Sequence, residues 1–185
     1  MGENPAMSDP DQNHARLALS KLHHLVVQDI FFTETAWFAD VIFPASAQPE
    51  KAGTYTNSNR QVQIGFPVRK APGDAEQDWK LIVDLANRCR LNWNYKNVSS
   101  VYKEMASTMS SLNNISWERL EKEGAVCYPV DDETSFGNEI LFSEGFPTSS
   151  GKAKIVTADL MPPDEKPNKK YPFILTTGRL LEHWH

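Results

Sequence analysis

Cysteine is scarce in this chain, and long apolar runs are absent. The 185 residues include two cysteines, Cys89 and Cys127, which lie far apart in the sequence. An iron–sulfur cluster is normally held by four cysteine thiolates, so these two residues do not suffice for one. No apolar run approaches the roughly 20 residues of a membrane-spanning helix, and no signal-peptide pattern opens the chain. We therefore expect no membrane contact from this segment. A cytoplasmic location is expected, although the segment carries no targeting information.

The chain also lacks an excess of positive charge. Lysine and arginine number 19 against 24 aspartate and glutamate residues, and the formal net charge is −5 at pH 7. A nucleic acid is therefore not an expected partner, because binding to its backbone requires a basic surface. A small anionic cofactor remains compatible with this charge, since backbone amides and a few basic side chains decide its binding. The length predicts one domain, or one domain and part of a second.

Hydrophobic spacing in the first 45 residues predicts an alternation of helices and strands. A helix is expected from Pro10 to about His23, with Asp9 as its N-terminal cap. A buried strand follows at Leu25–Gln28, a short helix at Thr33–Phe38, and a second strand at Val41–Phe43. This order predicts an α/β fold with parallel strands and helices on the faces of the sheet.

The remaining sequence predicts further elements with weaker patterns. Alternation predicts a strand at Gln61–Ile64, and a clear apolar stripe predicts a helix from Trp79 to Cys89, with Cys89 as a small buried hydrophobe on the apolar side. Less regular segments predict two more helices, at residues 101–109 and 116–123, and two more strands, at 152–157 and 173–177. Residues 161–170 are rich in proline and charge, which predicts a linker.

Two polar residues at the end of the first strand are the best candidates for a ligand site. Gln28 and Asp29 stand at the carboxyl end of that strand, where open α/β sheets bind their ligands. An amide and a carboxylate at such a position can bond the hydroxyl groups or the base edge of a nucleotide. The alternative interpretation is that the pair caps the turn at Thr33. Asp78 precedes a helix, where an acidic residue also has a purely structural explanation.

Several motifs in order give the chain a family resemblance. They are Gly2-Glu3-Asn4-Pro5, Val27-Gln28-Asp29-Ile30-Phe31, Ala39 to Ala45, Glu50 to Asn57, Gln77-Asp78-Trp79, Tyr171 to Arg179 and Glu182-His183-Trp184-His185. Together they resemble the catalytic alpha subunit of formate dehydrogenases, in the molybdopterin oxidoreductase (DMSO reductase) family. Such subunits are several times longer than this chain. The resemblance therefore implies that the chain is an internal fragment of such a subunit.

The resemblance implies a fold, a domain organisation and a reaction. Residues 1–95 would form a Rossmann-like, parallel-sheet portion of a molybdopterin-binding domain, on its guanosine side. A mixed α+β segment would cover 96–160 and a linker 161–170, and residues 171–185 would begin a truncated C-terminal β-barrel domain. The parent enzyme would oxidise formate to carbon dioxide at a molybdenum or tungsten centre carried by molybdopterin guanine dinucleotide, and the isolated fragment would be inactive. A 4Fe-4S cluster belongs to the parent only. The partners would be the remainder of the alpha subunit and its electron-transfer subunits.

The resemblance also assigns cofactor-binding residues, and it assigns none to catalysis or to the metal. Many relatives have aspartate where Asn4 stands, and some have serine in place of Ala45. The predicted acidic and polar residues, Asn4, Asp29 and Asp78 above all, would converge on a shared hollow that holds the guanosine. The full predicted set is Gly2, Asn4, Ser8, Gln28, Asp29, Ala45, Asp78, Gly178, Arg179, Leu180 and His183.

Three alternatives remain open from the sequence. The chain could derive from another molybdopterin oxidoreductase, such as a nitrate reductase. It could also be a non-catalytic nucleotide-binding module, or a scaffold that binds no ligand. Substrate assays of the complete protein would distinguish the first alternative, and nucleotide binding the other two.

Overall fold

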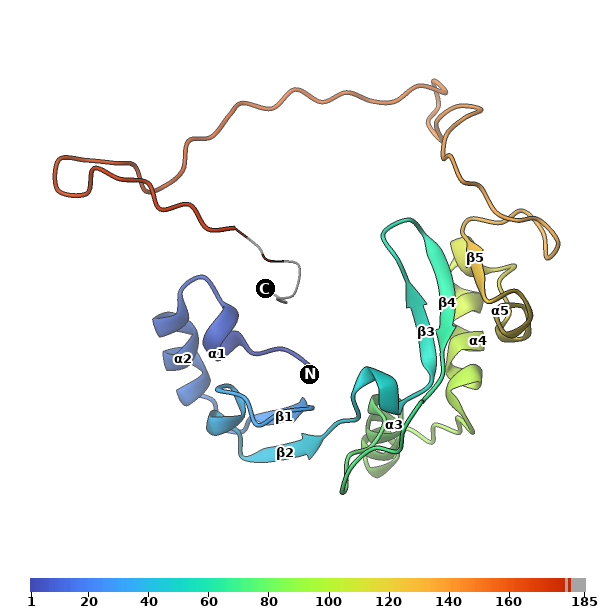
Figure 1. The fold of residues 1–185 in the computed structure, drawn as a ribbon, viewed down its shortest axis with the longest axis horizontal. Helices are drawn as coiled ribbons and strands as arrows, with labels where there is room; N and C mark the ends of the chain where they lie inside the picture. The colour runs from blue at the N-terminus through green and yellow to red at the C-terminus, as the bar shows by residue number, and fades with distance from the viewer. Residues whose placement is uncertain (179, 181–185) are drawn as a thin grey trace. The chain divides into compact units, whose positions relative to one another are not determined.

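The computed structural model describes residues 1–178 and 180. The chain divides into two compact units, Met1–Glu139 and Ile140–His185. The described helices and strands all lie in the first unit (Figure 1). The α-helices are α1 (Pro5–Ser8), α2 (Gln12–Ser20), α3 (Asp78–Arg88), α4 (Val98–Thr108) and α5 (Trp117–Glu123). The 3-10 helices are η1 (Ala36–Phe38), η2 (Gln48–Glu50) and η3 (Ser110–Leu112). The strands are β1 (Val26–Asp29), β2 (Val41–Pro44), β3 (Gly53–Thr56), β4 (Gln61–Gly65) and β5 (Ala125–Cys127).

Strands β1 and β2 form a parallel pair, as the alternation of helices and strands predicts. Their register runs from Val26 opposite Val41 to Asp29 opposite Pro44. Because the strands are parallel, the carboxyl ends of both lie at the same edge of the sheet. The predicted short helix between them is reduced to the single turn of η1.

A second sheet carries the main hydrophobic core. Strands β3, β4 and β5 are antiparallel in that order, and α4 and α5 contact this sheet. The buried side chains of the core come from the sheet, both helices and the loops between them: Val62, Tyr102, Ala106, Leu112, Ile115, Leu120, Val126 and Val130. Gly124 ends α5 with φ 80°, a left-handed conformation that favours glycine, and the helix predicted at residues 116–123 is confirmed.

The start of the chain differs from the prediction of a single helix capped by Asp9. Two helices form instead, and Asp9 ends α1. The cap of α2 is Asp11, whose Oδ1 accepts a hydrogen bond from the backbone N–H of His14 at 3.1 Å. The prediction of Asp9 as the cap is therefore wrong, because the chain bends at residues 9–11 and α2 begins after that bend.

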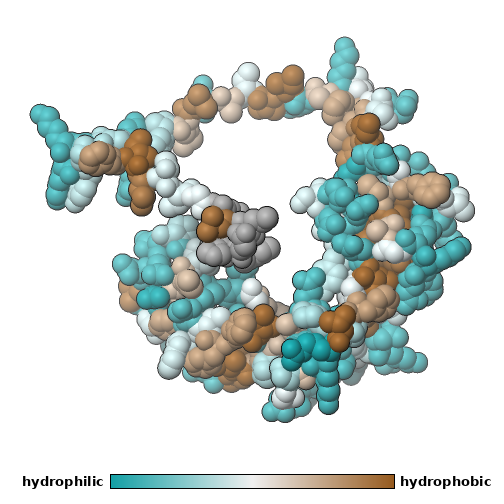
Figure 2. Space-filling view, viewed as in Figure 1, coloured by the Kyte–Doolittle hydropathy of each residue, from teal (hydrophilic) through white to brown (hydrophobic). Residues whose placement is uncertain are grey.

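Helix α3 is confirmed, but its predicted apolar stripe is only partly buried, with Trp79 and Val83 half-buried. Ala86 is its one buried residue, while Ile82 and Leu85 are 39% and 54% exposed. Cys89 is exposed as well, so the prediction of a buried thiol is wrong. It lies at the C-terminal cap, after the last helical turn. Large apolar side chains are also exposed after β1, and Figure 2 shows hydrophobic surface over the segment of β1 and β2.

The second unit contains no strand among its described residues, so the predicted strands at 152–157 and 173–177 are wrong. Ile155 is 91% exposed and Phe173 is 89% exposed. A strand is stable only when a neighbouring strand pairs with its backbone groups, and neither segment has such a partner among the described residues. The β-barrel domain is not confirmed, and the predicted domain boundaries stay predictions. Within residues 1–178 and 180, no helix is long and apolar enough to cross a membrane.

Candidate functional site

Four backbone segments meet at the carboxyl edge of the parallel pair. The backbone N–H of Gly2 donates to the carbonyl of Gln28 at 2.9 Å, so the N-terminal segment borders β1. The N–H of Ala45 donates to the carbonyl of Asp29 at 3.0 Å, and Ala45 forms a parallel bridge with Glu76 beyond β2. Gly2 has φ 60°, which favours glycine at this turn. The predicted residues Gly2, Gln28, Asp29 and Ala45 are therefore brought together.

Asp78 joins this edge through its side chain. It is the first residue of α3, and its Oδ1 accepts a hydrogen bond from Gln28 Nε2 at 2.7 Å. Its Oδ2 forms an ion pair with Lys51 Nζ. Gln28 is buried, so the amide that holds Asp78 is itself fixed within the sheet. Lys51 was absent from the predicted site, because the sequence does not show that a residue 27 positions before Asp78 reaches its carboxylate.

Asn4 lies in a separate hydrogen-bond network, between α1 and the loop that follows β1. Its Oδ1 accepts from the backbone N–H of Thr35 at 3.0 Å and from Thr35 Oγ1 at 2.7 Å. Its Nδ2 donates to Glu34 Oε2 at 2.6 Å. Thr35 Oγ1 in turn accepts from the N–H of Ala6 at 3.1 Å. Both lone pairs of the Asn4 carbonyl oxygen are therefore engaged inside the protein.

The hydrogen bond from Asn4 is also the main reason that the pKa of Glu34 is held below its usual value, with a smaller contribution from the backbone N–H of Glu34 itself. Replacing Asn4 with aspartate removes the donor and adds a negative charge. We expect the pKa of Glu34 to rise from below to above its usual value in Asn4→Asp. An NMR titration of side-chain carboxyl carbons measures this shift.

Glu76 provides the internal control in the same spectra. Its pKa is lowered mainly by the backbone N–H of Gln77, which donates to Glu76 Oε1 at 2.8 Å, and Asn4 has no part in this contact. The pKa of Glu76 should therefore stay where it is. A Glu34 that titrates identically in the two proteins would contradict the assigned role of Asn4.

Ser8 and Asp29 make local contacts that explain part of their positions. The Ser8 hydroxyl donates to the carbonyl of Asn4 at 3.1 Å, one turn back along α1, and Ser8 is exposed. Asp29 Oδ1 accepts from the N–H of Ile30 at 2.7 Å and of Phe31 at 3.4 Å. The turn-capping interpretation of Asp29 therefore has structural support, although at Ile30 and Phe31 rather than Thr33. The half-buried Asp29 still stands at the edge shared with Ala45.

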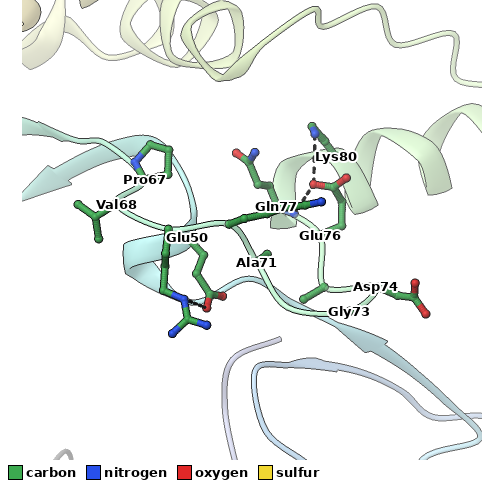
Figure 3. A pocket seen from close by; sticks show the side chains of 12 residues that line it. Glu50, Pro67, Val68, Ala71, Gly73, Asp74, Glu76, Gln77 and Lys80 are labelled. Carbon is green, nitrogen blue, oxygen red and sulfur yellow. Dashed lines mark hydrogen bonds and ion pairs between the residues drawn. The ribbon is translucent and has the colours of Figure 1, made fainter.

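An open cavity of about 680 Å³ lies beside this edge, between the turn of η2 and the start of α3 (Figure 3). Its acidic and basic side chains are partly paired: Arg69 Nε lies 3.4 Å from Glu50 Oε1, and Lys80 Nζ lies 3.2 Å from Glu76 Oε1. Asn4, Asp29 and Asp78 do not line this cavity. The hollow that these three residues would share stays a prediction.

Ser46 is a further residue at this edge that the sequence did not single out. It follows Ala45 and is fully buried, and its Oγ has no hydrogen-bond partner. Its backbone N–H donates to the carbonyl of Glu76 at 2.9 Å, which continues the pairing beyond β2. The burial of Ser46 depends on its packing against a segment 30 residues later in the chain. The sequence around a serine that follows a strand does not show such packing.

The predicted residues near the end of the chain are only partly described. Gly178 and Leu180 are exposed residues of the second unit. Arg179 and His183 lie outside the described residues. Among residues 1–178 and 180, no three histidine, cysteine, aspartate or glutamate side chains are grouped as they would be around a metal ion.

The chemistry of this edge fits a guanine base. A carboxylate has about four lone-pair sites, and Asp78 uses one on each oxygen for Gln28 and Lys51. One acceptor site therefore remains on each oxygen, and a side-by-side pair of acceptors matches the adjacent N–H groups of guanine. Asp78 is about one-third exposed, so its carboxylate is accessible from outside the protein.

Comparisons with known proteins agree with the resemblance read from the motifs. Residues 1–88 match the family model described as Molybdopterin oxidoreductase. The whole chain is similar to the F420-dependent formate dehydrogenase subunit alpha of Methanocaldococcus jannaschii, at 43% identity over 190 positions. It is also similar to the F420-dependent formate dehydrogenase 1 subunit alpha of Methanococcus maripaludis, at 38% identity over 187 positions.

The chain spans 28% of the length of each of these two relatives. This partial coverage agrees with the prediction that the chain corresponds to a fragment of a longer subunit. Among solved structures, acetylene hydratase from Pelobacter acetylenicus superposes with a TM-score of 0.53 at 24% sequence identity. The superposition covers 76% of this chain and 19% of the hydratase chain, and it supports the fold alone.

Proposed function

The chain is related to the molybdopterin oxidoreductases, with formate dehydrogenase alpha subunits among its relatives, and we propose that it supplies part of the cofactor-binding surface of such a subunit. The complete subunit oxidises formate to carbon dioxide at a molybdenum or tungsten centre, and it binds molybdopterin guanine dinucleotide. The isolated chain, which corresponds to a minor part of its relatives, is inactive. The relatives carry formate dehydrogenase in their names, which favours formate over nitrate as the substrate.

The observation that carries this proposal is the convergence of four predicted residues on one carboxylate-bearing edge. The backbone N–H groups of Gly2 and Ala45 donate to the carbonyls of Gln28 and Asp29 in β1. Asp78 accepts a side-chain hydrogen bond from Gln28. Ligands of open α/β folds bind at this edge of the sheet. Asp78 accepts hydrogen bonds from the guanine base, and Asp29 from the base or the ribose hydroxyls.

The cofactor supplies the redox chemistry when it is bound, and the residues of this chain hold and orient it. The turn at Gly2 and the backbone at Ala45 border the nucleotide. Asn4 and Ser8 shape the N-terminal wall of the site. The Asn4 side chain holds the start of α1 against the loop after β1, and the Ser8 hydroxyl donates back to the Asn4 carbonyl. Gly178, Arg179, Leu180 and His183 contact the pterin.

The remaining partners follow from the same relationship. The rest of the alpha subunit completes the site and carries a 4Fe-4S cluster, and electron-transfer subunits accept the electrons from formate. The complete protein is cytoplasmic. Assays of the full-length subunit with formate and with nitrate distinguish a formate dehydrogenase from a nitrate reductase.

We expect Asp78→Ala in the full-length subunit to lower its guanine dinucleotide content about tenfold, because a charge-assisted acceptor for the base is removed. Asp29→Ala should lower it less, since Asp29 Oδ1 already caps a turn. The measurement is the GMP released by acid hydrolysis per polypeptide, together with the metal content by mass spectrometry.

Asp84→Ala is the matched control. Asp84 lies on the same helix, 65% exposed and paired only with Arg88 at i,i+4, so its removal should leave the cofactor content unchanged. If Asp78→Ala and Asp29→Ala both load as the unmodified subunit does, the assignment of the guanosine site to this edge is wrong.

A further inference from the structure

We infer that Lys51 is a positioning residue, which holds the carboxylate of Asp78 in the orientation that accepts a guanine base. This inference rests on the proposed function, because it requires Asp78 to contact the guanosine. Lys51 does not itself contact the base. Its role is to fix one oxygen of Asp78 while Gln28 fixes the other.

The three side chains reach one point from three separate elements. Gln28 comes from β1, Lys51 directly follows η2, and Asp78 begins α3. Gln28 Nε2 donates to Asp78 Oδ1 at 2.7 Å, and Lys51 Nζ pairs with Asp78 Oδ2. Because each oxygen is bound to a different partner, the carboxylate cannot rotate without breaking a contact. An acceptor held in place in this way loses less side-chain entropy when a ligand binds.

The turn that carries Lys51 is itself fixed. Glu50 Oε2 accepts from the backbone N–H of Ala47 at 2.9 Å, and Glu50 Oε1 lies 3.4 Å from Arg69 Nε. The Glu50 side chain is only 9% exposed. Lys51 therefore approaches Asp78 from an anchored backbone. The Lys51 side chain is 27% exposed, so the ion pair is partly withdrawn from water and is screened less than a surface pair.

Gln28 alone cannot replace this contact. Its amide is neutral and reaches only Oδ1, so without Lys51 the second oxygen would turn toward water. The two acceptor sites that remain on Asp78 would then no longer lie side by side in a fixed plane. Guanine requires such a pair, because its Watson–Crick edge presents two neighbouring N–H donors. Adenine presents a donor beside an acceptor, so it does not match the same carboxylate.

The test uses the full-length subunit with Lys51→Met, which keeps the unbranched apolar part of the side chain and removes its charge. We expect the GMP released per polypeptide to fall about three- to tenfold, as for the loss of one charge-assisted hydrogen bond. Lys51→Arg should recover most of the content, because it restores the ion pair. Arg88→Met is the matched control: Arg88 forms an ion pair with Asp84 in the last turns of α3, and its loss should leave the content unchanged.

The double variant Lys51→Met/Asp78→Ala separates positioning from general destabilisation. If Lys51 acts through Asp78, the double variant should load no worse than Asp78→Ala alone. Losses that add up would overturn the inference, as would normal loading of Lys51→Met beside impaired loading of Asp78→Ala. Normal loading of Asp78→Ala would instead reject the proposed function. If circular dichroism shows that Lys51→Met does not fold, the cofactor content of Lys51→Gln is compared with that of Asp78→Ala instead.

Discussion

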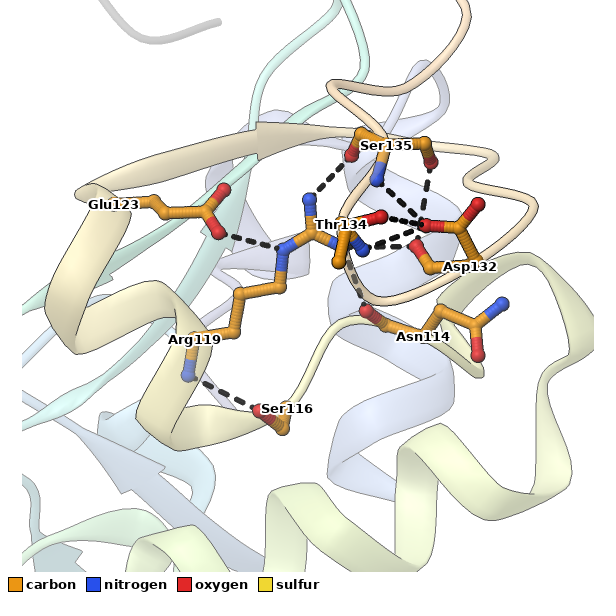
Figure 4. Close-up of polar contacts among 7 residues, drawn as sticks. All are labelled: Asn114, Ser116, Arg119, Glu123, Asp132, Thr134 and Ser135. Atoms are coloured by element: carbon orange, nitrogen blue, oxygen red, sulfur yellow. Dashed lines mark hydrogen bonds and ion pairs between the residues drawn. The ribbon is translucent and has the colours of Figure 1, made fainter.

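Replacing Arg119 with methionine is expected to lower the free energy of unfolding by about 3 kcal/mol, the largest effect of any polar substitution in the described chain. The Arg119 guanidinium holds two loops to α5, the one before α5 and the one after β5 (Figure 4). Its Nη1 donates to the carbonyls of Asn114 at 2.9 Å and Asp132 at 3.2 Å, and its Nη2 donates to the carbonyl of Ser135. Its Nε lies 3.1 Å from Glu123 Oε1.

Because Arg119 is buried, its loss strongly lowers the stability of the fold. Arg119 is 8% exposed, and methionine fills a similar volume without donating a hydrogen bond. Three carbonyl oxygens then lose their partner in a partly buried site, and each unsatisfied group costs about 1 kcal/mol or more. The loop that begins at Asp132 is also ordered by the Asp132 carboxylate, which accepts hydrogen bonds from the Thr134 hydroxyl and from the backbone N–H groups of Thr134 and Ser135. These hydrogen bonds lower the pKa of Asp132.

Chemical denaturation followed by far-ultraviolet circular dichroism measures the change. Arg88→Met is the matched control, because Arg88 is 75% exposed and forms only a surface ion pair with Asp84 at 2.9 Å. That variant should change stability by less than about 0.5 kcal/mol. Equal effects of the two substitutions would show that the Arg119 contacts contribute nothing beyond a surface charge.

Leu120→Ala is expected to destabilise the first unit by about 3 kcal/mol, within the usual range for a leucine removed from a packed core. Leu120 is 1% exposed and belongs to the cluster that includes Val62, Ile115 and Val126. These neighbours come from two strands and a loop, so they cannot close the resulting cavity without moving the sheet away from α5.

Leu85→Ala supplies the comparison for this core variant. Leu85→Ala is the same substitution as Leu120→Ala, but Leu85 lies on α3 and is 54% exposed. Alanine also has a higher helix propensity than leucine. The effect of Leu85→Ala should stay within about 0.5 kcal/mol. The same denaturation experiment serves for both variants. A Leu120→Ala protein as stable as the Leu85→Ala protein would contradict the assignment of the core to the sheet, α4 and α5.

Local signals predicted the elements that depend on local physics. Helices α3, α4 and α5 follow from apolar spacing and caps, and Gly124 ends α5 because it tolerates a positive φ. The alternation of helices and strands predicted that β1 and β2 are parallel. That arrangement alone brings Asp29 and Ala45 to one edge, so part of the candidate site was predictable before any coordinates.

Other predictions failed where the outcome depends on a distant partner. The segments 152–157 and 173–177 have strand-like sequences, yet a strand requires a neighbour, and none pairs with them in the described chain. Cys89 continues an apolar stripe, but a stripe is buried only if another element covers it. The choice of Asp11 over Asp9 as a cap depends on the bend between α1 and α2.

The amino-acid sequence by itself determined the family relationship, the parallel strand pair and the polar residues that end it, because these depend on residue identity and short spacing. Only the tertiary structure decided which side chains meet. Lys51 with Asp78 and Arg119 with three carbonyls are joined across loops, and no periodic pattern encodes such contacts. The physical reason is that a hydrogen bond between distant residues depends on how whole elements pack, whereas helix and strand signals depend on neighbours along the chain.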